Sequence, residues 1–339
     1  MNSLERVLAA VHFAQVDRLP LFLQISGFAA TSAGIALPEY LTKSEVLVSA
    51  QLAAAKRFQN DLLVAALDCC VEAEALGTEI TFVPEAYPHI KFPLIDNWRQ
   101  IEDLSIPDPY SAGRLPVLLE ACQMLLERDA GEHFVVGQTL GPTTLAAQIF
   151  GIENLMYLLI DEPEGFSRLL NFTAQVTQTL AEVLANLGVH GVMINEPSAS
   201  PNIFPPEVFR VFIQPLLQEV FVTLRRSYSG VNWLQITGNA TPILPLIDGL
   251  ELDLVTLDSP VELGRALEVF PRKTLCGNLN PLLFLKGRKE RLAESLPGTL
   301  KQGRKLGYIL GSGCEIPLDS DPRNLEYLIE LLRCRHHEL

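Results

Sequence analysis

Eight short segments rich in β-branched and apolar residues alternate with long helical patterns along this chain of 339 residues. Such alternation is typical of βαβ units and of a parallel sheet. Eight strands with intervening helices favour a closed (β/α)8 TIM barrel, an α/β fold, over an open sheet. We therefore predict one barrel domain over residues 1–339. The predicted strands are Leu19–Ser26, Leu62–Leu67, Phe134–Gly141, Gly191–Ser198, Asn232–Thr237, Leu252–Asp258, Thr274–Asn280 and Gly307–Cys314.

The helical patterns lie between these strands and before the first of them. Ser3–Phe13 predicts an N-terminal helical extension of the barrel. Thr42–Gln59 begins with Thr42 and Glu45 at the spacing of a capping box. Thr78–Pro109 is rich in proline and aromatic residues and predicts an elaborated loop. The remaining clear helices are predicted at Pro163–Leu187, Pro206–Ser227 and Pro322–Arg335.

The net charge and the hydropathy of the chain argue against two classes of partner, nucleic acids and membranes. The net charge of −14 argues against nucleic acid as a partner, because a phosphate backbone needs basic side chains. No apolar run approaches the roughly 18 residues that span a bilayer, and the first residues carry Glu5 and Arg6 in place of a signal-type apolar stretch. The six cysteines are scattered, as in a protein whose thiols stay reduced. We predict a cytoplasmic protein with no membrane partner.

Polar residues gather where the predicted strands end. In a barrel of parallel strands these ends meet at one mouth, where barrel enzymes carry out their chemistry. Each residue alone could equally cap a turn between strand and helix, but a set drawn from all eight strands favours a site. The set comprises Gln24, Ser26, Asp68, Cys69, Cys70, Thr139, Asn195, Glu196, Gln235, Thr237, Asp258, Asn278, Asn280, Cys314 and Glu315.

Five motifs, in order along nearly the whole chain, resemble the uroporphyrinogen decarboxylase superfamily. The stretch from Asp68 to Gly77 is similar to the segment that carries the decarboxylase's catalytic aspartate. The others are Asn2–Val7 with Asp17–Pro20, Gly141–Leu145, Gly277–Pro281 and Gly311–Pro317. The resemblance implies the barrel fold and two possible chemistries.

The first chemistry is decarboxylation of a tetrapyrrole that bears carboxylates. In the decarboxylases an arginine-bearing motif follows the first strand, and guanidinium groups are natural partners for carboxylates. The matching stretch here, Leu23–Ala30, contains no arginine. Cys314 lies where the decarboxylases have a histidine, and Gln148 lies where they have a tyrosine. Only Asp68 matches, which argues against porphyrinogen decarboxylation.

The second chemistry resembles that of methylcobamide:thiol methyltransferases and corrinoid-dependent demethylases. The resemblance implies a zinc site built from a His-x-Cys pair after the fifth strand, an acidic residue after the sixth and a cysteine after the eighth. Asp258 and Cys314 match the last two. Gln235 and Thr237 stand in place of the His-x-Cys pair, beside an intact Gly-Asn-x-Thr-Pro turn. Zinc prefers sulfur, imidazole and carboxylate ligands, so we predict a weak or absent zinc site at Cys314 and Asp258.

The sequence thus predicts a methyltransferase that moves a methyl group between a corrinoid-binding protein and a small molecule. Its predicted catalytic residues are Asp68, Glu196 and Cys314. Its predicted substrate contacts are Gln24, Asn195, Gln235, Thr237, Asn278 and Gln148. Two alternatives stay open, a decarboxylase of a tetrapyrrole and a non-catalytic protein that binds a tetrapyrrole or corrinoid. Ordinary packing is favoured over metal ligation for Cys69 and Cys70, and His89 is a weaker candidate for substrate contact.

Overall fold

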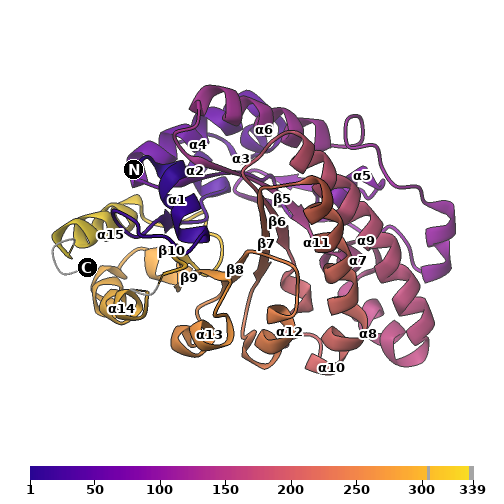
Figure 1. Ribbon diagram of the computed structural model, residues 1–339. Helices are drawn as coiled ribbons and strands as arrows, with labels where there is room; N and C mark the ends of the chain where they lie inside the picture. The colour runs from indigo at the N-terminus through magenta and orange to yellow at the C-terminus, as the bar shows by residue number, and fades with distance from the viewer. Residues whose placement is uncertain (304–305, 336–339) are drawn as a thin grey trace.

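The computed structural model describes residues 1–303 and 306–335. Eight parallel strands form one sheet in the order β1-β10-β9-β8-β7-β6-β5-β2, and Figure 1 shows it curled on itself inside a layer of helices. The predicted α/β TIM barrel is therefore confirmed. The strands are β1 (Leu21–Phe22), β2 (Leu62–Ala65), β5 (Phe134–Leu140), β6 (Gly191–Asn195), β7 (Val231–Ile236), β8 (Leu254–Leu257), β9 (Thr274–Leu279) and β10 (Tyr308–Ser312).

The seam between β1 and β2 is bridged by the carboxamide of Asn60. Its oxygen accepts a hydrogen bond from the Leu23 N–H at 2.7 Å, and its nitrogen donates to the carbonyls of Leu23 at 3.1 Å and Leu62 at 2.8 Å. A side chain thus replaces part of the ladder between these two strands. This replacement explains why β1 is two residues long, where the sequence predicted Leu19–Ser26.

Asp61 anchors the N-terminal extension to the barrel. The side chain of this aspartate is fully buried, and its carboxylate pairs with Arg6 of α1 (Ser3–Val11) and with Arg18, both at 2.7 Å. α1 packs Val7 and Ala10 against the apolar interior of the barrel. The predicted helical extension therefore closes the end of the barrel opposite the mouth.

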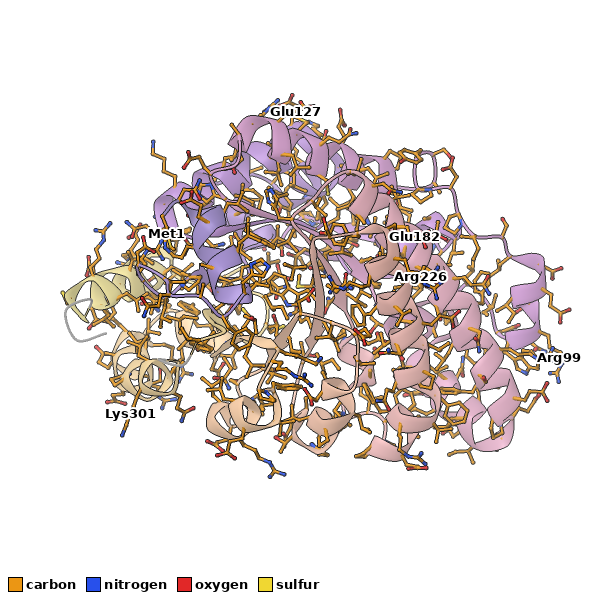
Figure 2. All side chains as sticks on the ribbon, in the orientation of Figure 1. Met1, Arg99, Glu127, Glu182, Arg226 and Lys301 are labelled. Carbon is orange, nitrogen blue, oxygen red and sulfur yellow. The ribbon has the colours of Figure 1, made fainter. Side chains whose placement is uncertain are left out.

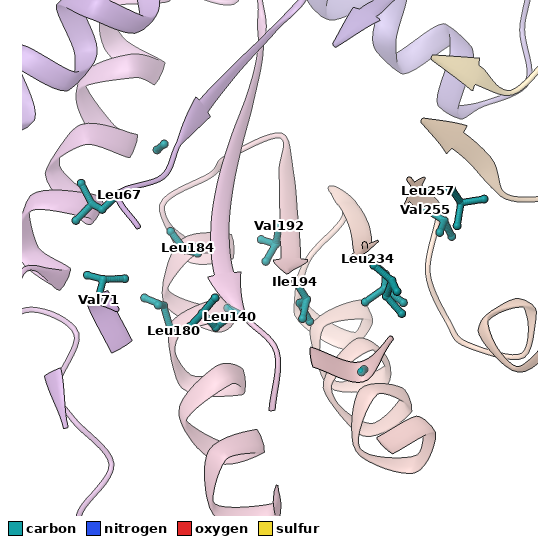
Figure 3. Close-up of a cluster of buried hydrophobic side chains, with 14 of the residues drawn as sticks. Leu67, Val71, Leu140, Leu180, Leu184, Val192, Ile194, Leu234, Val255 and Leu257 are labelled. Atoms are coloured by element: carbon teal, nitrogen blue, oxygen red, sulfur yellow. The ribbon is translucent and has the colours of Figure 1, made fainter. Parts of the chain in front are cut away.

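Strand alternation separates two apolar layers. Met193 of β6 faces the barrel interior, while its neighbours Val192 and Ile194 belong to the layer between sheet and helices. Figure 3 shows this outer layer, with Val192 and Ile194 of β6 and Leu184 of α9 (Pro163–Asn186) among its labelled side chains. Charged side chains such as those of Glu127 and Lys301 lie at the periphery (Figure 2).

Two predicted helices differ in detail. Thr42–Gln59 is divided into α3 (Leu37–Thr42) and α4 (Ser44–Phe58), and the hydroxyl of Thr42 donates to the Pro38 carbonyl at 2.6 Å. The predicted capping box is therefore wrong. Pro206–Ser227 begins as α10 (Pro206–Val208), passes through a π-helical turn, η3 (Phe209–Ile213), and continues as α11 (Gln214–Ser227). Pro215 lacks the N–H of a regular helix, and a π turn accommodates such a break.

The predicted loop Thr78–Pro109 contains an antiparallel hairpin of β3 (Ile80–Val83) and β4 (Ala86–Ile90).

Within the described residues no single helix has the length and composition of a membrane span. The helices α7 (Pro142–Phe150) and α8 (Ile152–Asp161), bent by 104°, meet those criteria only as a pair. His336 and His337 lie outside the described residues. The other elements are α2 (Gly27–Ser32), α5 (Val71–Ala75), η1 (Trp98–Asp103), α6 (Leu115–Asp129), α7 (Pro142–Phe150), α8 (Ile152–Asp161), η2 (Pro197–Ala199), η4 (Thr241–Ile243), α12 (Leu244–Asp248), α13 (Leu263–Val269), η5 (Pro281–Phe284), α14 (Lys289–Gln302) and α15 (Pro322–Arg335).

Candidate active site

A cavity of about 200 Å³ lies at the carboxyl ends of the strands. Strand alternation aims its side chains inward, since Asn195 and Gln235 each lie two residues beyond an interior core residue, Met193 and Trp233. These two amides also face each other in register across β6 and β7. The lining comprises Gln24, Ser26, Ala66, Leu67, Asp68, Cys69, Gln138, Asn195, Pro197, Gln235, Thr237, Cys314 and Glu315.

Four carboxamides dominate this lining. The Gln235 amide donates to the Gln24 oxygen at 2.7 Å. The buried side-chain oxygens of Gln138, Asn195 and Gln235 have no hydrogen-bond partner among the described residues. A buried polar atom without a partner costs about 1–3 kcal/mol, so these oxygens point to a bound molecule as their partner.

Asp68 lines the same cavity but is held by a residue that the sequence analysis missed. Arg114, just before α6, donates to both carboxylate oxygens of Asp68, at 2.5 and 3.2 Å. Arg114 also donates to Glu74 at 2.6 Å and lies 5.1 Å from the centre of the Phe82 ring. The Cys70 N–H donates to Asp68 at 2.8 Å. Asp68 is therefore a charge-compensated carboxylate whose orientation is fixed.

Glu315 is a second carboxyl group on the lining. The Tyr87 hydroxyl, from β4, donates to this carboxyl group, and the Gly27 N–H donates to the Tyr87 oxygen at 2.7 Å. Burial raises the pKa of Glu315 to about 7. The hairpin is thus tied through Tyr87 to the loop that follows β10.

Two further hollows adjoin the central cavity. One, of about 220 Å³, shares Asp68, Cys69 and Glu315 with it and also carries Gln148 and His89. The other, of about 260 Å³, shares Pro197 and Thr237, and its remaining lining residues are Ser200, Asn202, Ile203, Gly238, Asn239 and Pro260. In the part of the chain that the structure describes, no lysine or arginine lines any of the three. The site is hydrogen-bonding and short of positive charge.

Glu196 does not line the cavity, contrary to the predicted arrangement. It follows Asn195 and therefore points to the opposite side of the strand. Its carboxylate accepts hydrogen bonds from the Thr143 N–H at 2.7 Å and the Thr144 N–H at 2.9 Å, at the N-terminus of α7. A carboxylate there satisfies free N–H groups and favours the helix dipole. Its position is that of a buried helix cap.

Thr139 and Cys70 also turn away from the central cavity. The Thr139 hydroxyl donates to Glu72 at 3.0 Å, so Gln138 is the residue of β5 that faces inward. Cys70 is buried and its thiol donates to the Pro88 carbonyl at 3.3 Å, whereas Cys69 is exposed and lines the cavity. Strand alternation, counted from a known core residue, would have identified Gln138.

Asp258 and Asn278 lie beside the site but not on its lining. Both carboxylate oxygens of Asp258 accept backbone N–H groups, from Gly238 at 2.9 Å and Ser259 at 2.6 Å. The Asn278 amide donates to the Val261 carbonyl at 2.6 Å. These bonds hold the loops after β7 and β8 in place.

The donors do not fit a zinc ion. Gln235 and Thr237 offer a neutral amide and a hydroxyl, which are weak ligands for zinc compared with sulfur, imidazole or carboxylate. Gln235 already bonds Gln24, and Asp258 is occupied by backbone N–H groups. Over residues 1–303 and 306–335, no three histidine, cysteine or acidic side chains are grouped as metal ligands.

Comparison with known proteins shows which family and which solved structures this chain resembles. The sequence profile of the uroporphyrinogen decarboxylase family matches residues 2–334. A methylcobamide:CoM methyltransferase of Methanosarcina barkeri is 26% identical over 96% of this chain and 95% of its own length. A uroporphyrinogen decarboxylase of Thermodesulfovibrio yellowstonii is 23% identical, over 85% of this chain and 83% of its own. A solved methyltransferase from Methanosarcina mazei has the same fold, with a TM-score of 0.88, 23% identity and 98% of both chains covered.

Proposed function

The chain belongs to the uroporphyrinogen decarboxylase family, and we propose that it is a corrinoid-linked methyltransferase that moves a methyl group between a corrinoid protein and a small molecule. Relatives at similar identity include one named as a methyltransferase and one named as a uroporphyrinogen decarboxylase. The choice between these two activities therefore rests on the site.

The observation that carries the choice is the absence of cationic side chains from the lining described above. A tetrapyrrole with several carboxylates needs guanidinium or ammonium partners at the mouth. Arg114, the nearby guanidinium, is committed to Asp68 and Glu74. A corrinoid ring instead carries carboxamide side chains, which pair with neutral groups such as Asn202 and Asn239 on the outer hollow.

The chain's own part in the reaction is binding and orientation. The corrinoid, carried by a partner protein, supplies the bond between carbon and cobalt. Gln24, Asn195, Gln235 and Thr237 hold the small molecule at the floor of the cavity, in line with the open mouth. Asp68 supports the wall through Arg114. Positioning of this kind converts a bimolecular encounter into an oriented one, which alone accounts for a large share of many rate enhancements.

Glu196 and Cys314 have different parts in this proposal. Glu196 supports α7 and touches no substrate. Cys314 faces the cavity as a neutral thiol and packs against the bound molecule. The acidic surface and the scattered cysteines support a cytoplasmic location, where corrinoid partners and reduced thiols are available.

Methylcobalamin tests the proposal directly. The purified protein is incubated with methylcobalamin and a panel of small amines, alcohols and thiols, and loss of the methyl–cobalt bond is followed by absorbance. We expect enzyme-dependent loss with one acceptor class, abolished in the double variant Asn195→Leu/Gln235→Leu. The same preparation is tested with uroporphyrinogen. Decarboxylation without methyl loss would overturn the proposal, and tight corrinoid binding without turnover would favour a non-catalytic binder.

A further inference from the structure

Side-chain oxygens without a hydrogen-bond partner on the cavity floor indicate which kind of ligand binds there. Asn195 and Gln235 are more than nine-tenths buried, and their side-chain oxygens meet neither protein nor solvent. Gln138, on the neighbouring strand, adds a third such oxygen. Terminal amide torsions are broad, so each carboxamide can turn its oxygen toward a molecule in the cavity. Three acceptors from three adjacent strands call for a group with several hydrogens to donate.

The charge of the residues that line the cavity limits the charge that the bound group can carry. The ionisable acids on the cavity wall are Asp68 and Glu315, together with two cysteine thiols, and none of its residues is basic. Arg114 balances Asp68 from behind the wall. An anion would meet carboxyl oxygens with no cation to receive it, which buried sites strongly disfavour. A cation would meet the two carboxyl groups and the oxygens of the neutral carboxamides.

The volume of the cavity limits the size of the molecule that can bind in it. The cavity of about 200 Å³ is smaller than the roughly 300–1,000 Å³ typical of pockets for drug-sized ligands. It therefore accommodates a molecule of a few heavy atoms. Hydroxyl groups donate one hydrogen and ammonium groups donate two or three, so the number of free acceptors favours nitrogen.

We propose that the small molecule is an amine, bound as its ammonium ion by the carboxamide oxygens of Gln138, Asn195 and Gln235. This inference rests on the proposed function: a methylated ammonium ion would give up its methyl group to the corrinoid of the partner protein and leave as the neutral amine, so that one C–N bond breaks as the methyl group is transferred. Gln235 and Thr237 then have a chemical meaning, because they offer neutral acceptors at the positions where the resemblance to thiol methyltransferases implies a zinc-ligand pair.

Three probes of equal length and different charge test the inference. Binding of n-propylammonium, 1-propanol and propionate is measured by calorimetry at pH 7.5, where an aliphatic amine with a pKa of about 10.5 is protonated. We expect n-propylammonium to bind at least tenfold more tightly than 1-propanol, and propionate not to bind. Equal or tighter binding of propionate would overturn the inference, and so would equal binding of the alcohol.

Variants locate the binding group. Asn195→Leu and Gln235→Leu each remove one acceptor at similar volume, and each should weaken n-propylammonium binding at least tenfold. The matched substitution Asn171→Leu on the exposed face of α9 should leave it unchanged. Unaltered affinity in both cavity variants would contradict the assignment. Should either variant fail to fold, the three-probe comparison on the native protein decides alone. No corrinoid enters this assay, so its failure is separable from failure of methyl transfer.

Discussion

Asp68 and Arg114 form a buried ion pair. Its loss should lower the free energy of unfolding more directly than it lowers the rate of the reaction. Their side chains are 1% and 8% exposed, and two N–H groups of the guanidinium meet the carboxylate. Asp68→Asn leaves Arg114 with Glu74 alone. Breaking a buried ion pair from one side costs about 3–5 kcal/mol. We expect roughly 3 kcal/mol here, at the lower end, because Glu74 still compensates part of the charge.

A double-variant cycle measures this coupling. Urea unfolding is followed by the fluorescence of the two tryptophans, Trp98 and Trp233, both of which are buried. Asp68→Asn and Arg114→Gln should each lower the free energy of unfolding by about 3 kcal/mol, and the double variant by only about 2 kcal/mol. As a control, Glu164→Gln breaks an exposed pair with Arg168 and should cost at most about 0.5 kcal/mol.

The same variants separate support from chemistry. If Asp68 acts only as support for the wall, the double variant should recover part of the lost stability together with methyl transfer. If the Asp68 carboxylate also acts on the substrate, the double variant is stable and remains slow. Two single variants that each lose less than about 0.5 kcal/mol would refute the buried-pair reasoning altogether.

Three other changes test other parts of the fold and site. Burial raises the pKa of Glu72 to about 7, so its contribution to stability is fully present below pH of about 4.5 and is lost as the pH rises through 7. Glu72→Gln should therefore match the native melting temperature near pH 5 and exceed it at pH 8; a lower value at pH 8 would contradict the sign. Gln235→His with Thr237→Cys should turn a weak zinc site into one that holds a stoichiometric ion against a chelator. Chelator-resistant zinc in the native protein would show that the ligand set has been misread. Asn60→Ala should open the seam beside β1 and lower the free energy of unfolding by roughly 3 kcal/mol, against little change for exposed Asn171→Ala; equal losses would assign the seam to other contacts.

The barrel was predictable because its signal is local. A buried parallel strand is a short apolar run, and a covering helix shows its own periodicity, so Phe134–Leu140 and Pro163–Asn186 were found within a residue or so of their ends. The first strand was overextended because Leu23 takes its hydrogen bonds from the Asn60 side chain. Apolar runs look the same whether a strand or a side chain satisfies their backbone, so the sequence pattern contained no sign of this difference.

The site was predictable only where strand ends determine it. Asn195, Gln235 and Cys314 were placed at the mouth because each ends a strand of the barrel. Arg114 and Tyr87 escaped notice because each comes from a segment between strands, whose course depends on tertiary packing. Composition near Asp68 offers no hint that the carboxylate's partner lies 46 residues further along the chain.

The placement of Gln235 and Thr237 explains how the chemistry of this family can change while its barrel stays the same. Gln235 lies near the end of β7 and Thr237 directly follows that strand; both line the cavity, and neither belongs to the apolar layers that hold strands and helices together. The turn that follows is fixed by backbone contacts, such as that of the Gly238 N–H with Asp258. We therefore expect substitution at these two positions to alter what the cavity binds at little cost to folding. The proposed recognition of an ammonium ion would thus require changes at the cavity and not in the barrel that carries it.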